Sequence, residues 1–326
     1  MLQHFRITGS ARYLPAHKIE SEELDTRLGF PRGTTFARTG VQTRHQALAP
    51  ENAATMAKHV IEHALTSARA DLSGVDLLID ASLCLQQPIP CNAALIQEAI
   101  GPAAAGIPCM DTHASCLGFF AALRTVNGLF ASESLRRIVV VCSETSLLGV
   151  NWTEPESACL MGDGAAAFVF ERNPTPTPCA LAMETYAEGA HLCEVAGGGH
   201  LLPSYVFNKT IESRYLFRMD GKALHKLASR HLPALVQRVL RDAACTSAEL
   251  DVVPHQASGP AIELIARRLD LPRERFHVSI AEHGNLVSAS IPFVLHKVRN
   301  EKPTGSRILL LGTAAGYTQA AGVITL

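Results

Sequence analysis

One stretch of thirteen residues, DTHASCLGFFAAL at positions 111–123, decides the fold prediction. It follows a short apolar segment, residues 106–110, that is typical of a strand entering a turn. Beyond Cys116, nearly every residue as far as Phe130 is apolar or small. A helix that is apolar on all faces belongs in the core of a large domain. Cys116 is therefore expected where a strand ends and a buried helix begins.

Two interpretations of Cys116 follow from that position. The unpaired N–H groups and the positive dipole end of a helix favour a thiolate, which is the nucleophilic form of cysteine. A free cysteine is also among the most commonly buried residue types and often acts only as a small hydrophobic side chain. This stretch alone favours neither interpretation.

The composition predicts a globular protein with a sizeable hydrophobic core. The chain has 326 residues, of which 47% are hydrophobic and 18% charged, enough for one large domain or two joined halves. Its net charge of -1 gives no overall attraction to nucleic acid or to an anionic membrane. Nine cysteines without a C-x-x-C pair indicate neither a zinc site nor a disulfide framework. Since residues 1–10 lack the apolar core of a signal peptide and no apolar run is long enough to span a bilayer, a cytoplasmic protein is expected.

Alternate prolines at residues 173–178 interrupt the chain. Because proline cannot continue a helix or a central strand, this segment is predicted to be a stiff connection. It divides the chain into an N-terminal half, residues 1–172, and a C-terminal half, residues 173–326.

The two halves repeat the same order of elements. The apolar run 75–80 recurs at 250–255, and the run 137–141 recurs at 307–311. Between them, the turn at Cys116 is matched with a turn at Asn285. The offsets are 175, 169 and 170 residues, nearly constant and in the same order. A duplicated α/β unit with two copies packed back to back is predicted, so that loops at the strand ends of both copies meet at one site.

This duplication places Cys116, His255 and Asn285 at equivalent ends of core strands. Each residue also has a structural explanation, since a histidine at a strand end is often only hydrogen-bonded and an asparagine beside glycine often forms a turn. The order Cys, His, Asn occurs in cysteine peptidases as well. Order and spacing alone leave these alternatives open.

The segments 111–119, 253–257 and 283–285 resemble the three catalytic motifs of β-ketoacyl-acyl carrier protein synthase III, a family of thiolase-like condensing enzymes. The resemblance covers most of the chain. Further matching segments are residues 38–40, 162–164, 219–221 and 316–318. The resemblance implies the thiolase fold, with two pseudo-repeated halves in a five-layered α-β-α-β-α core, and a homodimer.

The resemblance also implies a mechanism. Cys116 would accept an acyl group from a thioester, with the backbone N–H groups of Cys116 and Ala315 binding the oxyanion. His255 and Asn285 would donate hydrogen bonds to the carbonyl of a malonyl thioester, carried by acyl carrier protein, while it loses carbon dioxide. Phe120, one turn beyond the nucleophile, would shield the site from water. No metal or redox cofactor is expected, because phosphopantetheine carries both substrates.

The chain departs from the family at the predicted coenzyme A site. Many members place a tryptophan where this chain has Thr34 and an arginine where it has Pro155, and these two clasp the adenine. Their loss favours a carrier protein as the first acyl donor. The same loss favours a specialised pathway over primary fatty-acid synthesis.

Three further positions concern partners. A basic residue often used for docking the carrier aligns with Pro260, whereas Arg267 and Arg268 remain on the same predicted helix and could meet an acidic carrier. Ile89 aligns near the residue that enters the partner subunit's acyl tunnel. Relatives that make long-chain ketones have a catalytic glutamate there, so Ile89 argues against that chemistry.

Two alternatives remain within the fold. One is an acyltransferase that passes the acyl group to an alcohol or amine without decarboxylation, and the other is a non-catalytic subunit of a heteromeric synthase. The intact His255 and Asn285 pair argues against the first, and retention of all three residues, Cys116, His255 and Asn285, argues against the second. A thiolase is disfavoured because no cysteine follows Cys245, and hydroxymethylglutaryl or plant-type polyketide synthases are generally longer. A cysteine peptidase would not account for the duplication.

Overall fold

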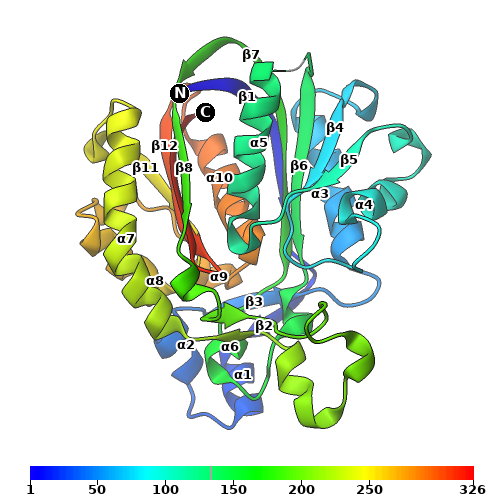
Figure 1. Cartoon of the computed structure of the whole chain (residues 1–326), viewed down its shortest axis with the longest axis vertical. Coiled ribbons are helices and arrows are strands. Elements are labelled where there is room, and N and C mark those ends of the chain that lie inside the picture. Colours follow the sequence, from blue (N-terminus) through cyan, green and yellow to red (C-terminus); the bar gives the residue numbers. More distant parts are fainter. Residues whose placement is uncertain (133) are drawn as a thin grey trace.

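Two stacked β-sheets with a helical layer between them form the architecture (Figure 1). The computed structural model describes residues 1–132 and 134–326. Helices α5 (Gly118–Ser132) and α10 (Ser290–Glu301) lie between the sheets. Helices α3 (Ala53–Ser67) and α4 (Asn92–Ile100) cover the outer face of one sheet, and α7 (Gly221–Asp242) and α8 (Gly259–Arg268) cover the outer face of the other. This arrangement confirms the predicted α-β-α-β-α layers.

The two sheets share one topology. In the N-terminal sheet the order is β1 (Leu2–Tyr13), β7 (Gly164–Pro178), β6 (Arg137–Glu144), β4 (Leu77–Asp80) and β5 (Cys109–Asp111). In the C-terminal sheet it is β8 (Ala180–Thr185), β13 (Thr318–Thr325), β12 (Arg307–Ala314) and β11 (Asp251–Pro254). β4 runs parallel to β6 as β11 does to β12, while β7 and β13 run antiparallel to their neighbours. A single parallel bridge between Val252 and Phe276 lies where β5 pairs with β4 in the other half.

The counterpart of Cys116 differs from the prediction. A 3-10 turn at Ser115–Leu117 precedes α5, and one at Val287–Ala289 precedes α10. Each turn begins with a non-glycine residue of positive φ, 49° at Ser115 and 51° at Val287. Cys116 therefore matches Ser288, and the expected match with Asn285 is wrong by three residues. The loops before the two turns differ in length, which a nearly constant sequence offset conceals.

The prediction that the proline-rich segment 173–178 interrupts the strand is also wrong. β7 continues through it, with Thr177 opposite Gln3 and Pro178 opposite Leu2. β6 begins at Arg137 opposite Glu171, so among the strands of residues 1–132 and 134–326 the end of β7 has β1 as its one neighbour. Proline is tolerated there because its missing N–H can face the open side of the strand. The boundary between residues 172 and 173 falls inside β7 and stays a prediction.

Apolar packing holds the layers together. The central cluster joins both sheets to α5 and α10 and includes Phe119, Phe120, Phe168 and Phe293, each at most 1% exposed. Separate clusters attach α3 and α4 to the N-terminal sheet and α7 and α8 to the C-terminal sheet. Burying each such aromatic side chain stabilises the fold by about 1.5–3 kcal/mol.

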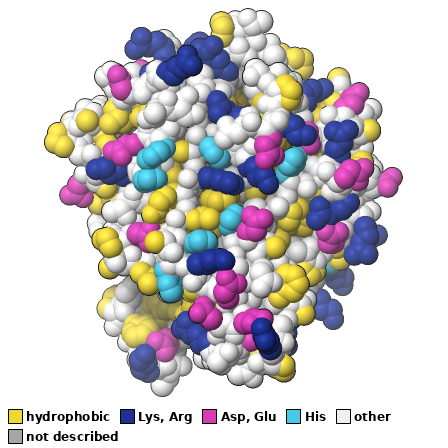
Figure 2. All heavy atoms as spheres, turned by 180° about the vertical axis from the view of Figure 1, so that it is seen from behind, with side chains coloured by type: hydrophobic (Ala, Val, Ile, Leu, Met, Phe, Trp, Pro, Cys, Tyr) yellow, Lys and Arg dark blue, Asp and Glu magenta, His cyan; other side chains and the backbone are white. Residues whose placement is uncertain are grey.

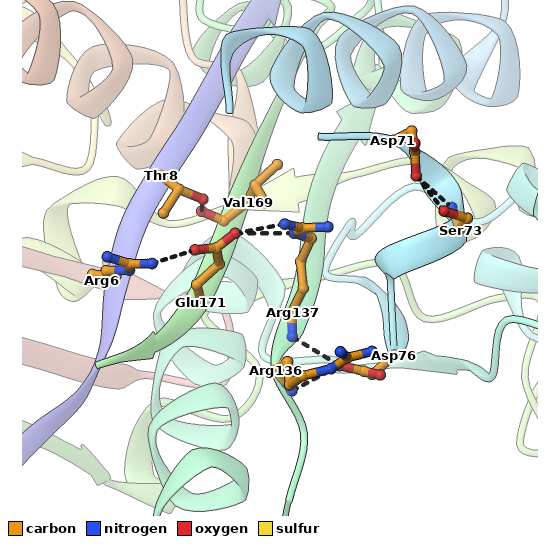
Figure 3. A network of polar contacts seen from close by, with 9 residues as sticks. All are labelled: Arg6, Thr8, Asp71, Ser73, Asp76, Arg136, Arg137, Val169 and Glu171. Carbon is orange, nitrogen blue, oxygen red and sulfur yellow. Dashed lines mark hydrogen bonds and ion pairs between the residues drawn. The ribbon is translucent and has the colours of Figure 1, made fainter. Parts of the chain in front are cut away.

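A polar network ties three strands of the N-terminal sheet together where β6 begins (Figure 3). Glu171 on β7 accepts hydrogen bonds from Arg6 on β1 and Arg137 on β6, both at 2.7 Å. The Asp76 carboxylate accepts from the backbone N–H groups of Arg136 and Arg137. These charge-assisted bonds fix the relative positions of β1, β7 and β6.

Short elements gather at the opposite end of the sheets (Figure 1). They are β2 (His17–Glu20), α1 (Ser21–Leu28), α2 (Thr34–Thr39), β3 (Thr43–Gln46), α6 (Pro155–Ala158), β9 (Cys193–Glu194), β10 (Arg218–Met219) and α9 (Ile280–His283). In the described part of the chain, none of the helices combines the length and the apolar character needed to cross a membrane.

Charges on the surface are mixed. Figure 2 shows the face opposite to that of Figure 1, where basic and acidic side chains are interspersed and histidines gather near the centre. This distribution agrees with the net charge of -1. A partner that carries mostly one sign of charge would therefore need a local patch of the opposite charge on this surface.

Candidate active site

Cys116, His255 and Asn285 line one cavity of about 550 Å³. Cys116 lies in the 3-10 turn before α5, His255 follows β11, and Asn285 follows α9. Ala314, the last residue of β12, and Ala315, the first residue after it, line the same cavity. The structure thus brings together residues that lie up to 199 positions apart in the sequence, from Cys116 to Ala315.

The surroundings of the Cys116 thiol favour its protonated form. Burial raises its pKa to about 12, and the nearby Glu144 carboxylate contributes in the same direction. The backbone N–H groups of Ala315 and Cys116 point at the sulfur and lower the pKa by less. The helix start therefore does not by itself produce the thiolate that the sequence suggested.

His255 is neutral at pH 7. Burial lowers its pKa to about 4, and the residue is only 5% exposed. Its backbone N–H donates to the Leu311 carbonyl at 2.7 Å, which fixes the turn after β11. Among the described residues, the ring Nδ1 atom has no hydrogen-bond partner. A neutral imidazole can donate one hydrogen bond without carrying charge into the site.

The Asn285 amide has a defined orientation. Its Oδ1 atom accepts from the Val287 N–H at 2.9 Å and from the Ser290 hydroxyl at 3.4 Å. With the oxygen engaged on the α10 side, the Nδ2 group remains as a donor for the cavity. The Asn285 backbone bridges to the segment at Met161, donating to the Leu160 carbonyl at 2.8 Å.

Gly284 makes this bridge possible. Its φ is 71°, and a Cβ atom there would lie 2.8 Å from the Leu160 carbonyl oxygen. A side chain would therefore push Asn285 away from the cavity wall.

The other predicted residues lie around the site rather than in it. Phe120 is wholly buried in the central cluster and is not among the residues that line the cavity, so its shielding role stays a prediction. Ile89 is 82% exposed on the loop between β4 and α4. Pro155 and Pro260 line the cavity, whereas Thr34 at the start of α2 does not.

Arg267 and Arg268 are exposed at the end of α8. Arg268 lines an open groove of about 770 Å³ between α7 and α8. The groove is basic and lies beside the cavity, since His225 lines both. Its other charged residues are Asp220, Lys222, Lys226 and Arg230.

Sequence patterns missed part of the cavity wall. Cys193 on β9 lines the cavity, and so do Phe217, Leu224 and Ala228. Cys193 pairs with Met219 on β10 in a ribbon of two residues per strand, too short to give a periodic signal. Met219 in the segment 219–221 was the one available indication of this wall.

Comparison with known proteins identifies the family. Residues 110–189 match the family model of 3-oxoacyl-[acyl-carrier-protein] synthase III, and residues 240–326 match the model of its C-terminal part. The chain is 30% identical to the β-ketoacyl-[acyl-carrier-protein] synthase III of Neisseria meningitidis serogroup B over 98% of both chains. The chain belongs to the β-ketoacyl-acyl carrier protein synthase III family. It is a condensing enzyme, an acyltransferase of the thiolase fold.

Solved structures of the family agree. The 3-oxoacyl-[acyl-carrier-protein] synthase III of Aquifex aeolicus has a TM-score of 0.88 and 27% identity, covering 99% of this chain and 100% of its own. The priming β-ketosynthase of the R1128 polyketide pathway has a TM-score of 0.90, covering 100% of this chain and 97% of its own. At 24% identity, the second comparison supports the fold alone.

Proposed function

We propose that this synthase holds an acyl group on Cys116 and condenses it with a malonyl thioester to give a β-ketoacyl thioester. The proposal rests on one observation: the thiol, two uncharged hydrogen-bond donors and the Ala315 N–H converge on a single cavity.

In the first half-reaction, the Cys116 sulfur attacks the carbonyl carbon of an acyl thioester. The oxyanion accepts hydrogen bonds from the N–H groups of Cys116 and Ala315, which already face the sulfur. The carrier thiol leaves with the proton that Cys116 loses, and the acyl group stays on the sulfur. Because burial raises the thiol pKa, we couple the loss of the proton to the attack of the sulfur.

In the second half-reaction, His255 and Asn285 bind the carbonyl oxygen of the malonyl thioester. Loss of carbon dioxide leaves an enolate, whose negative oxygen both donors stabilise. The enolate carbon attacks the acyl carbonyl, a carbon–carbon bond forms as the carbon–sulfur bond to Cys116 breaks, and the released thiolate takes a proton from solvent. Neutral donors suit this step because they do not pair with the malonyl carboxylate that must depart.

A carrier protein fits the surface better than free coenzyme A does. Thr34 and Pro155 cannot stack on adenine as a tryptophan and an arginine would. The chain's single tryptophan, Trp152, already has the Arg27 guanidinium 3.8 Å from its ring centre. The basic groove between α7 and α8, at which Arg268 lies, suits an acidic carrier helix.

We further propose a homodimer in which Ile89 enters the acyl tunnel of the second copy. The side chain is 82% exposed on its own chain, so it is free to make such a contact. Three-residue β5 is the outer strand of its sheet and offers an unpaired edge nearby.

Intact-protein mass spectrometry tests the function. The protein is incubated with matched acyl-carrier and acyl-coenzyme A thioesters, and then with malonyl-carrier protein. A mass gain equal to the acyl group, lost on addition of malonyl-carrier protein with formation of a β-ketoacyl product, is expected. Loading without condensation would favour the simple acyltransferase, and no loading from any donor would contradict the proposal.

A further inference from the structure

The turn that carries Ala315 is held in an unusual backbone conformation. Gly316 has φ 77° and Tyr317 has φ 36°. Glycine adopts such angles freely, but a bulky aromatic residue rarely does, and it persists there only when its surroundings hold it. The strained residue lies two positions from the Ala315 N–H that faces Cys116.

A buried polar chain fixes the Tyr317 side chain. The ring is fully buried, and its hydroxyl donates to Gln319 Oε1 at 3.0 Å. Gln319, also fully buried, donates through Nε2 to Glu184 Oε2 at 2.8 Å. Glu184 accepts in turn from Tyr186 at 2.9 Å and pairs with Arg238 on α7 at 2.8 Å.

The Tyr317 backbone is fixed as well. Its carbonyl accepts from the Tyr186 N–H at 3.0 Å. Gly189 lies against it, since a Cβ atom there would be 2.3 Å from the Tyr317 Cβ. Tyr317 is thus tied to the C-terminal sheet and to the segment after β8 at the same time.

We propose that Tyr317 and Gln319 are positioning residues that aim the Ala315 N–H at the reacting acyl carbonyl. This inference rests on the proposed function of the site. Gly316 gives the turn no stiffness of its own, so the direction of the Ala315 peptide depends on where Tyr317 is anchored. The hydroxyl matters because it, and not the ring, connects the turn to Gln319 and Glu184.

The two half-reactions separate this role from a merely structural one. Acyl loading uses the Ala315 N–H, whereas decarboxylation of a malonyl thioester uses His255 and Asn285. Tyr317→Phe keeps the ring but removes the hydroxyl. We expect acyl loading to slow by about 5- to 50-fold, less than loss of a whole oxyanion donor, with the KM for the acyl thioester changed by less than about twofold. Decarboxylation of malonyl-carrier protein should stay within about twofold of the wild type.

Gln319→Leu interrupts the same series of hydrogen bonds at its second member. It should likewise slow acyl loading and leave decarboxylation unchanged. Tyr13→Phe is the matched control. Tyr13 lies on β1, outside the cavity, and the substitution removes the hydrogen bond from its hydroxyl to the Glu51 carboxylate. It should leave both half-reactions unchanged. Thermal unfolding confirms that each variant is folded.

Equal slowing of loading and decarboxylation in folded variants would overturn the inference, and so would unchanged loading. A wild-type protein that does not load at all would instead overturn the proposed function.

Discussion

The turns before α5 and α10 have the same backbone and opposite surroundings. Both begin with a positive φ, form a 3-10 turn and enter a central helix. The Cys116 sulfur faces the cavity and the Ala315 N–H, whereas the Ser288 hydroxyl donates to the buried Glu144 carboxylate. The two halves have equivalent helix starts, and the residues at the neighbouring strand ends distinguish the cavity beside Cys116 from the filled site beside Ser288.

The decisive neighbours are the last residues of two matching strands. β6 ends in Glu144 and β12 ends in Ala314. Glu144 is wholly buried and accepts from the N–H groups of Leu83 at 2.7 Å and Cys84 at 3.0 Å. A carboxylate therefore fills the second site, while the small alanine leaves the first one open.

Apart from removal of Cys116 itself, the largest expected effect concerns Asn285, three residues before Ser288. Asn285→Ala should still accept an acyl group but decarboxylate the malonyl thioester roughly 100- to 1,000-fold more slowly, because it loses one of two donors to the enolate. Carbon dioxide release from labelled malonyl-carrier protein measures this. Normal release would remove Asn285 from the mechanism.

The choice of donor tests what enters the open site. With Thr34 and Pro155 at the two positions that we propose lack an adenine clasp, losing two stacking contacts of about 0.5–2 kcal/mol each should weaken the binding of coenzyme A esters by about 10- to 1,000-fold. Acyl-carrier substrates should therefore load Cys116 with much higher kcat/KM than the matching coenzyme A esters. Stopped-flow loading assays measure both.

Reversing the charges of Arg267 and Arg268 serves as the control for the carrier. Only the carrier reaction should suffer, and more strongly at low salt. Equal loading from both donors, unaffected by the reversal, would contradict this account of the donor.

Glu144→Gln tests whether the filled site influences the open one. Removing a neighbouring negative charge should lower the Cys116 pKa from its value of about 12, since the carboxylate opposes a thiolate. The pH dependence of alkylation at Cys116 gives the pKa. Because Glu144 also accepts from Ser288, Ser288→Ala is the matched variant that breaks one bond and keeps the charge. A pKa unchanged in Glu144→Gln would show that the two turns are electrostatically independent.

The smallest expected effect lies far from both turns. Arg137 and Arg6 outweigh the effect of burial and lower the Glu171 pKa below its usual value. A lowered pKa contributes stability that is present above the unfolded value of about 4.3 and is lost as the pH falls through the folded value. Glu171→Gln should therefore cost about 1–3 kcal/mol at pH 7 and progressively less below pH about 4.

Urea unfolding at several pH values measures this difference. Acyl loading by folded Glu171→Gln should equal that of the wild type, since the network in Figure 3 does not reach the cavity. A loading defect in the folded variant would contradict the separation of the remote network from the site.

The strand–turn–helix at Cys116 could be predicted because a helix that is apolar on every face has only one place in a globular protein. The duplication was also visible, since buried parallel strands leave long β-branched runs. The match between Cys116 and Asn285 failed because loop lengths drift between copies, and only backbone angles reveal Ser288. The prolines of β7 led to the wrong prediction of a connection, because the sequence does not show that this part of the strand pairs on one side only.

The chemistry of the site was harder to predict than its residues. The thiolate expected at Cys116 depends on burial and on Glu144, neither of which is local in sequence. Cys193 lines the cavity from a two-residue strand, which is too short to give a periodic pattern in the sequence. The chain Tyr317–Gln319–Glu184 spans 135 positions between its last two members and needs the folded sheet to exist.

Peptide mapping after acyl loading tests the central claim most directly. The wild type and Ser288→Ala should carry the acyl group on the peptide containing Cys116, and Cys116→Ala should load at least about 1,000-fold more slowly, as expected when a covalent nucleophile is removed. An acyl group on any other residue, or undiminished loading by Cys116→Ala, would contradict the account.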